Sequence, residues 1–379
     1  MTLRPALHNG GRGKQVAKFR ALSGRGVSAA LSTWLGFALS IGLPATSASS
    51  ARMADPAARS FVSSHYGRAQ ILVPVAKGRR INMVCLGKGQ PAVLFMSGLG
   101  GGSFDWRRVQ PEVGRNTRAC AYDRAGYGFS DPTSEKSDVE HALLDLHALL
   151  HSGGIARPVV LVAHSLAGIY AVAYAKRYPG DVAGMVLVDP AFPNQTRLIA
   201  DAVGSAAATK LAASTAETMS FLDRCVTLAD SGRLSLPTEA SSDCLDNPAD
   251  PDPAVHRERD RAAKIAGYQR AIRSEYQDAN VLGANGRTID DVQSDAIPGD
   301  LGSLPLAVLT RGNKGALSGL SPAEIERSET VWQAGHDRLA ALSRLGTNEI
   351  VPGADHFIQL DRPATVIERI RGVLEKARR

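Results

Sequence analysis

The most informative part of the sequence is V-V-L-V-A-H-S-L-A-G-I-Y, which runs from Val159 to Tyr170. Its first half is a short apolar run typical of a buried strand, and its second half is typical of a helix. Ser165 stands at the junction, with Ala163 and Ala167 two residues to either side. A sharp strand-to-helix turn strains the backbone and leaves room only for small side chains at those two positions. The pattern predicts that Ser165 is presented on such a turn as a nucleophile; the alternative is a serine that only caps the helix.

Strand-like and helix-like segments alternate on both sides of this turn. Apolar runs that predict strands are residues 69–76, 81–86, 91–96, 117–122, 158–162, 182–188, 304–310 and 348–351, and helical spacing follows several of them. This alternation predicts an α/β fold, with a mostly parallel sheet and helices on both faces. The alternation breaks after residue 193, because residues 194–300 are polar and helix-like. We expect this segment to be inserted over the ends of the sheet.

A serine hydroxyl becomes a good nucleophile only when a base takes its proton. G-A-D-H-F, residues 353–357, places His356 after a strand and before the C-terminal helix. Histidine suits the role of base because its pKa lies near the operating pH. His164 adjoins Ser165 but should point elsewhere, since side chains alternate along a strand, and we interpret it as a packing residue.

A glycine-rich loop, S-G-L-G-G-G at residues 97–102, follows the third predicted strand. Glycines allow backbone N–H groups to approach a ligand closely. Such groups, together with the N–H after the nucleophile, would stabilise a developing oxyanion. The backbones of Leu99 and Leu166 are therefore the candidate oxyanion hole; the alternative is a flexible turn.

Taken together, these motifs resemble the α/β-hydrolase superfamily. The matching blocks are S-G-L-G-G-G (97–102), Y-D-R-A-G-Y-G-F-S-D-P (122–132), A-H-S-L-A-G (163–168), V-L-V-D-P (186–190) and G-A-D-H-F (353–357). The resemblance covers roughly residues 70–375 and is weakest in the inserted segment. It implies an eight-stranded sheet built from residues 69–193 and 301–379, a helical lid at 194–300, and no metal or organic cofactor.

The resemblance also suggests where the acid that orients the histidine is found. In this superfamily it commonly follows the strand predicted here at 304–310, but T-R-G-N-K-G (310–315) contains no carboxylate. Some members supply the acid one strand earlier, and Asp189 stands at that strand end. Asp189 is therefore the predicted acid, which would stabilise the imidazolium. The alternatives are that Asp189 only caps the turn before Pro190, or that the acid is Asp355, Glu329 or Asp361.

These residues predict hydrolysis of a carboxylic ester through an acyl-enzyme intermediate, with a small acyl compound as substrate. Amide, thioester and lactone hydrolysis use the same machinery. Superfamily members that open epoxides or remove halides use an Asp nucleophile, so Ser165 argues against both reactions. The alternatives are a cofactor-free perhydrolase or acyltransferase with the same triad, or a non-catalytic binding protein that retains the fold. Neither the substrate nor the oligomeric state follows from the sequence.

The basic character of the chain is confined to its N-terminus. The formal charge is +7, but residues 1–50 contain six Lys and Arg and no acidic residue, which leaves 7 − 6 = +1. The rest of the chain thus offers no electrostatic case for binding nucleic acid.

The uncharged run at residues 26–50 predicts a signal peptide (1–48) that is cleaved near Ala48, followed by a linker (49–68). It also predicts export to the periplasm or the medium without stable membrane association. The alternative is an uncleaved membrane anchor.

Four cysteines follow this segment: Cys85, Cys120, Cys225 and Cys244. An even number in an exported chain is consistent with two disulfides, and no pair has the C-x-x-C spacing of a zinc site. The superfamily places the second strand beside the fourth, which implies a Cys85–Cys120 bond. Cys225 and Cys244 would close a short loop within the lid. Four buried thiols are the alternative.

Overall fold

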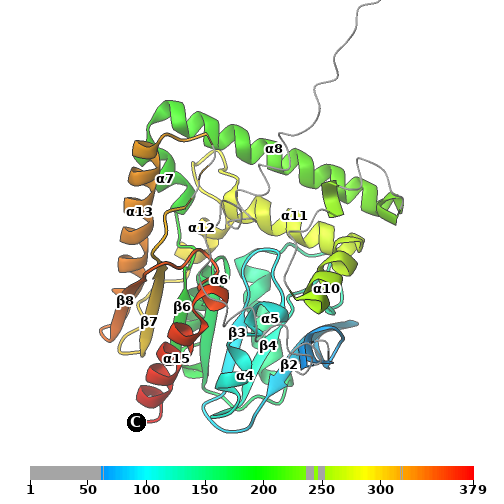
Figure 1. The fold of residues 1–379 in the computed structure, drawn as a ribbon, viewed down its shortest axis with the longest axis vertical. Helices are drawn as coiled ribbons and strands as arrows, with labels where there is room; N and C mark the ends of the chain where they lie inside the picture. The colour runs from blue at the N-terminus through cyan, green and yellow to red at the C-terminus, as the bar shows by residue number, and fades with distance from the viewer. Residues whose placement is uncertain (1–60, 63, 236–242, 246–251, 316, 318) are drawn as a thin grey trace, which may run out of the picture.

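An eight-stranded sheet forms the centre of the computed structural model, which describes residues 61–62, 64–235, 243–245, 252–315, 317 and 319–379 (Figure 1). The strands are β1 Ile71–Ala76, β2 Arg79–Leu86, β3 Val93–Met96, β4 Ala119–Tyr122, β5 Val159–His164, β6 Val182–Val188, β7 Leu306–Arg311 and β8 Gly346–Val351. Their order is β1-β2-β4-β3-β5-β6-β7-β8. Only the β1–β2 and β2–β4 pairings are antiparallel among these strands. The predicted α/β class with a mostly parallel sheet is confirmed.

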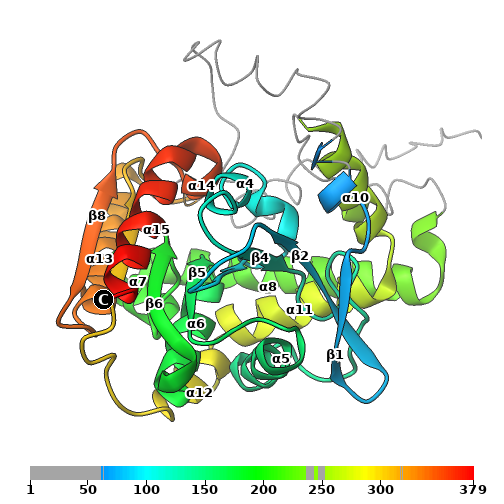
Figure 2. The ribbon, with the colours of Figure 1, turned by 90° about the horizontal axis from the view of Figure 1, so that it is seen from below.

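Helices cover both faces of this sheet (Figure 2). One face packs against α5 Val139–Ser152, α6 Ala167–Arg177 and α13 Pro322–Ala340. The other packs against η1 Ser103–Trp106, α4 Gln110–Val113, α14 Ile358–Asp361 and α15 Pro363–Ala377. All residues of β3, β4, β5 and β7 are buried. A strand buried on both faces needs apolar residues at nearly every position, which is why the sequence contains continuous apolar runs instead of alternation.

The inserted segment is helical and lies over the carboxyl ends of the strands in Figure 1. Its elements are α7 Gln195–Val203, α8 Ser205–Asp230, η3 Arg233–Ser235, α10 Pro253–Ala263, α11 Ala266–Asn280 and α12 Ile289–Asp295. Phe221 and Leu222 of α8 share a buried cluster with Ile272 and Tyr276 of α11. We refer to α7–α12 as the lid.

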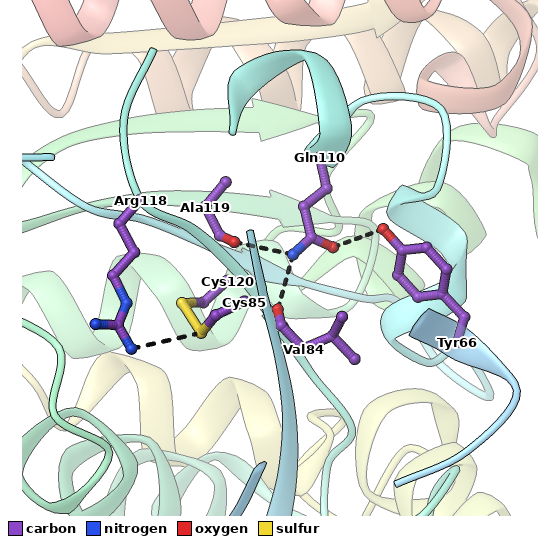
Figure 3. Close-up of a disulfide and its surroundings, with 7 residues drawn as sticks. All are labelled: Tyr66, Val84, Cys85, Gln110, Arg118, Ala119 and Cys120. Atoms are coloured by element: carbon purple, nitrogen blue, oxygen red, sulfur yellow. Dashed lines mark hydrogen bonds between the residues drawn. A yellow bond between two sulfur atoms is a disulfide. The ribbon is translucent and has the colours of Figure 1, made fainter. Parts of the chain in front are cut away.

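The predicted signal peptide, residues 1–48, and most of the predicted linker lie outside the described residues. The end of the linker prediction is wrong, because residues 61–62 and 64–66 are helical and pack onto the core. Val62 and Tyr66 are buried there, and the Tyr66 hydroxyl donates a 2.9 Å hydrogen bond to Gln110. The Gln110 amide donates in turn to backbone carbonyls of β2 and β4, as Figure 3 shows. An aromatic ring with a buried partner for its hydroxyl belongs to a folded core.

No helix in the described ranges is long and apolar enough to cross a membrane.

Both expected disulfides are present in the structure. Cys85 of β2 lies directly opposite Cys120 of β4 in the antiparallel register, and their sulfurs are bonded (Figure 3). Cys225 of α8 is bonded to Cys244, 19 residues further along the chain. Disulfides persist in oxidising compartments, so both bonds are consistent with an exported protein.

Removal of the lid disulfide by the pair of substitutions Cys225→Ala and Cys244→Ala should lower the free energy of unfolding by about 3 kcal/mol, the loop-entropy value for a closed loop of this length. Urea unfolding followed by far-UV circular dichroism would measure the change. The matched control is reduction of the unsubstituted protein, which opens both bonds and should destabilise it further. An unchanged denaturation midpoint in the double variant would show that the bond contributes nothing to lid stability.

Candidate active site

Ser165 occupies a sharp turn between β5 and α6. Its φ is +52°, in the left-handed region that non-glycine residues rarely adopt. The backbone is held there because Ser165 donates its N–H to Val188 O (3.2 Å) and accepts at its own carbonyl from Gly168 N and Ala191 N. A Cβ on Gly168 would lie 2.5 Å from Pro190, so only glycine allows α6 to approach the end of β6 this closely. The turn matches the geometry predicted for a presented nucleophile.

Three predicted residues meet at the carboxyl edge of the sheet. His356, in the loop between β8 and α14, places Nε2 2.9 Å from the Ser165 hydroxyl oxygen. Its Nδ1 lies 2.6 Å from Oδ2 of Asp189, the residue that follows β6. Because β5, β6 and β8 are parallel, their carboxyl ends lie at one edge, and residues 165, 189 and 356 come together there. The arrangement has the connectivity of a Ser–His–Asp triad.

Asp189 is completely buried and accepts four hydrogen bonds. Trp332 Nε1 and Arg311 N donate to Oδ1, at 3.0 and 3.1 Å. His356 Nδ1 and Arg311 Nη1 donate to Oδ2. Burial alone would raise the pKa of this carboxyl, but Arg311 and the hydrogen bond from His356 outweigh it and hold the pKa well below its usual range. Asp189 is therefore ionised and aimed at the histidine.

The other acids considered from the sequence bind elsewhere. Glu329 accepts hydrogen bonds from Arg311 and from the backbone of Gly315. Asp355 accepts one from Asn313, and Asp361 accepts one from the backbone N–H of Asp355. His356 Nδ1 meets Asp189 instead.

The Ser97–Gly102 loop packs directly against the nucleophile. A Cβ on Gly98 would lie 2.9 Å from the Ser165 Cβ and 3.0 Å from His164 Nδ1, so this position must be glycine. The next residue, Leu99, lines the same cavity as Ser165 and His356. Leu166, the other residue proposed for the oxyanion hole, follows Ser165 at the start of α6.

A buried arginine fixes the orientation of this loop. Arg124 donates one hydrogen bond to Ser97 O and another, of 2.8 Å, to Gly98 O. In a trans peptide the C=O and the N–H point in opposite directions. With the Gly98 carbonyl turned toward Arg124, the N–H of Leu99 points away from Arg124. Arg124 also forms a bidentate pair with Glu275 of α11, so a lid residue holds the arginine in place.

A cavity of about 1030 Å³, counted with the space that opens to solvent, lies between the sheet edge and the lid. Ser165, Leu166 and His356 form its floor, and α7, α11 and α13 contribute its walls. The lining is largely apolar, from Leu99, Ile169, Phe192, Ile199, Leu317 and Trp332, with polar or charged side chains from Gln195, Thr196, Asn280, Asp291, Arg311, Ser328 and Glu329. Met219, Phe221, Leu222 and Tyr268 of the lid are not among the lining residues; they belong to a buried cluster that also includes Tyr127.

Comparison with known proteins identifies the family. The sequence pattern that describes the "Alpha/beta hydrolase family" matches residues 93–369, which is most of the chain. The protein belongs to the alpha/beta hydrolase family. A 2-hydroxy-6-oxo-2,4-heptadienoate hydrolase from Pseudomonas putida is 35% identical over 117 residues, 30% of this chain and 42% of that protein. The chain covers less than half of the length of each of the first three curated relatives that it matches.

Solved structures share the fold of this family member at low sequence identity. A haloalkane dehalogenase from Agrobacterium tumefaciens superposes with a TM-score of 0.56 at 18% identity, covering 81% of this chain and 96% of that one. A carboxylesterase from Bacillus subtilis gives 0.50 at 16% identity, covering 86% and 98%. These structures establish a common architecture for the alpha/beta hydrolase described here.

Two residues that support Asp189 in this alpha/beta hydrolase were not predicted from the sequence. Arg311 ends β7, at the position where many members carry the acid, and its guanidinium binds Asp189 and Glu329. The arginine in T-R-G-N-K-G, at the end of a predicted strand, was the feature of the sequence that could have indicated this role. Trp332, the second, had no signal, because its contact with Asp189 depends on how α13 docks.

The interpretation of His164 as packing alone is incomplete. Its Nε2 lies 3.0 Å from the carbonyl oxygen of His356, and the two imidazole rings are 4.7 Å apart. Burial lowers the pKa of His164 to about 3, so the ring is neutral and Nε2–H can donate to that carbonyl. His164 therefore anchors the backbone that carries His356.

Proposed function

We propose that the protein hydrolyses carboxylic esters through an acyl-enzyme intermediate. Ser165 attacks the ester carbonyl while His356 Nε2 takes its proton and then delivers it to the departing alcohol. Water repeats the attack on the acyl-enzyme with His356 again as base. Asp189 holds the imidazole with Nδ1–H toward itself and stabilises its charged form. The 2.9 Å contact between the Ser165 hydroxyl and a histidine backed by a buried, ionised aspartate carries this proposal.

The nucleophile separates this proposal from the reactions of other family members. Attack of a serine oxygen on the saturated carbon of an epoxide or haloalkane would leave an ether. Water activated by a histidine base does not cleave an ether, so the enzyme would stay alkylated. Attack on an acyl carbon leaves an ester, which the same base can hydrolyse. Ser165 therefore favours an acyl substrate, and the haloalkane dehalogenase neighbour shares the fold without indicating the reaction.

The cavity indicates the general kind of ester. Ser165 and His356 line one part of it, most of its other lining residues are apolar, and its polar side chains come from α7, α11, α12, β7 and α13. Such a site buries an apolar acyl or alcohol group and uses a small number of polar groups to orient it. We propose a small-molecule ester with an apolar group of moderate size, acted on outside the cytoplasm, where both disulfides are stable.

A fluorophosphonate probe tests the assignment of the nucleophile. The purified protein should be labelled on Ser165, as shown by mass spectrometry of the modified peptide, and should hydrolyse aryl esters of at least some acyl-chain lengths. Ser165→Ala should abolish labelling. Ser328→Ala is the matched control, because Ser328 lines the same cavity while its hydroxyl donates to the backbone of Ile325, and this variant should label normally.

Two results would overturn the proposal. A folded protein that neither reacts with the probe nor hydrolyses any ester of the series would be a binding protein with an inactive site. Labelling that persists in Ser165→Ala would place the nucleophile elsewhere. Adding an alcohol to the assay distinguishes the transferase alternative, because a preference for forming a new ester over free acid would reassign the reaction to acyl transfer.

A further inference from the structure

Two histidines and an aspartate come together near the amino end of β6, whereas Asp189 of the triad follows its carboxyl end. His147 and His151 are one turn apart on α5, and Asp181 ends the short helix η2, Pro179–Asp181, just before β6. Asp189 follows β6, so the strand separates the two sites by about 25 Å at the usual rise per residue. Nothing in the proposed ester hydrolysis uses this cluster, which we refer to as the His–His–Asp cluster.

The spacing of the ligand atoms matches a tetrahedral metal site. His147 Nδ1 lies 3.5 Å from Asp181 Oδ2, and His151 Nε2 lies 3.3 Å from the same oxygen. All three candidate ligand atoms are within 4.8 Å of one another. With metal–ligand distances of about 2.0–2.2 Å, tetrahedral geometry puts neighbouring ligand atoms about 3.3–3.6 Å apart. Two edges of the cluster already have this length, and the third is no longer than 4.8 Å.

Surrounding groups orient these side chains, as they do in metal sites of other proteins. The Tyr174 hydroxyl donates a 2.7 Å hydrogen bond to Asp181 Oδ2, and Arg157 donates to Oδ1. The His147 ring stacks on Tyr178, with centroids 4.2 Å apart. The carboxylate and one imidazole are therefore held in position before any ion arrives.

The position of the cluster in the fold also favours a cation. His151 lies in the last turn of α5, where the negative end of the helix dipole attracts positive charge.

We propose that His147, His151 and Asp181 bind a divalent transition metal of the zinc type, with water in the fourth position. Two imidazoles and a carboxylate form a donor set that zinc and its neighbours prefer over magnesium or calcium. The side chains of His147 and His151 are 35% and 37% exposed, so the ion enters from solvent. The bound ion links the end of α5 to the turn before β6. The positive charge of Arg157 opposes it, so binding is reversible and weaker than at a four-ligand structural site.

Zinc titration of the purified protein, stripped with chelator and free of any affinity tag, tests the proposal. Isothermal titration calorimetry should detect binding at this site in the unsubstituted protein, and zinc should raise its melting temperature. His151→Ala should weaken binding at least tenfold and abolish the shift in melting temperature; the side chain is half-exposed, so this variant should fold. Co²⁺ provides a second readout, because four-coordinate Co²⁺ absorbs visible light strongly.

The matched control is His141→Ala. His141 is on the same helix, and its imidazole also lies beside carboxylates, those of Asp138 and Glu135. This variant should bind zinc as the unsubstituted protein does. All four cysteines are in disulfides, so no thiolate competes for the ion. Equal zinc affinity with and without His151, or an equal loss in His141→Ala, would overturn the proposal. The outcome is independent of labelling at Ser165, because neither site contributes residues to the other.

Discussion

Replacement of Asp189 by asparagine is expected to lower kcat for ester hydrolysis by about 10⁴-fold, the loss seen when a triad aspartate is made neutral. The amide oxygen can still accept from Trp332 and from the backbone of Arg311. The amide NH₂ then faces His356 Nδ1, which must become an acceptor. The imidazole proton moves to Nε2 and points at Ser165, so the ring can no longer take the hydroxyl proton. A steady-state assay on the best aryl ester measures the change.

The protein should remain folded, because Arg311 keeps Glu329 as a buried partner for its charge. Near-identical far-UV circular dichroism would verify this. Glu329→Gln is the matched control: it removes the other carboxylate bound to Arg311 but touches neither His356 nor Ser165, so kcat should fall far less. If Asp189→Asn folds and keeps nearly full kcat, Asp189 is not the acid, and the same substitution at Asp355 and Asp361 should be tested.

Arg124→Lys should lower kcat by about 10²-fold, comparable to the loss of one oxyanion-hole donor. Lysine keeps a positive charge beside Glu275, so the buried acid stays paired. A single ammonium group cannot hold Glu275 in a bidentate pair and also bind the carbonyls of Ser97 and Gly98. The Gly98–Leu99 peptide is then free to turn, and the N–H of Leu99, the predicted oxyanion donor, is no longer held in place. KM should change less than kcat, because the donor matters most in the transition state.

Arg79→Lys is the control for the general cost of changing an arginine in a bidentate pair. Arg79 binds Asp145 through two hydrogen bonds and does not contact the oxyanion loop. That variant should keep kcat. Comparable kcat values for Arg124→Lys and Arg79→Lys would show that the arginine does not position the loop.

The parts of the fold that follow from local pattern could be predicted from the sequence. Strands buried on both faces appear as short apolar runs, and the turn at Ser165 is marked by small residues on either side. The Cys85–Cys120 pair followed from strand order, and the structure places the two residues in register. Parallel strands bring their carboxyl ends together, so residues far apart in sequence could be nominated for one site.

Contacts that depend on docking could not be predicted. Arg124 and Glu275 are 151 residues apart, and their pairing requires that α11 lie over the oxyanion loop. The contact of Trp332 with Asp189 depends in the same way on the placement of α13. The cavity-lining residues of the lid also depend on which side of each helix faces the sheet. The burial of Val62 and Tyr66 was missed because a short segment rich in small and polar residues has no period that marks a core contact.

The two disulfides have a practical consequence for anyone who produces this protein. Expression in the reducing cytosol of a bacterial host would yield a chain with four thiols, two on neighbouring strands of the central sheet and two in the lid. The lid carries Glu275, which holds Arg124, so a loosened lid would reduce turnover even where the triad is intact. Preparations made in the cytosol, or stored with dithiothreitol, should therefore show low and variable specific activity. Secretion into the periplasm, or refolding with a glutathione redox couple, should give uniform material.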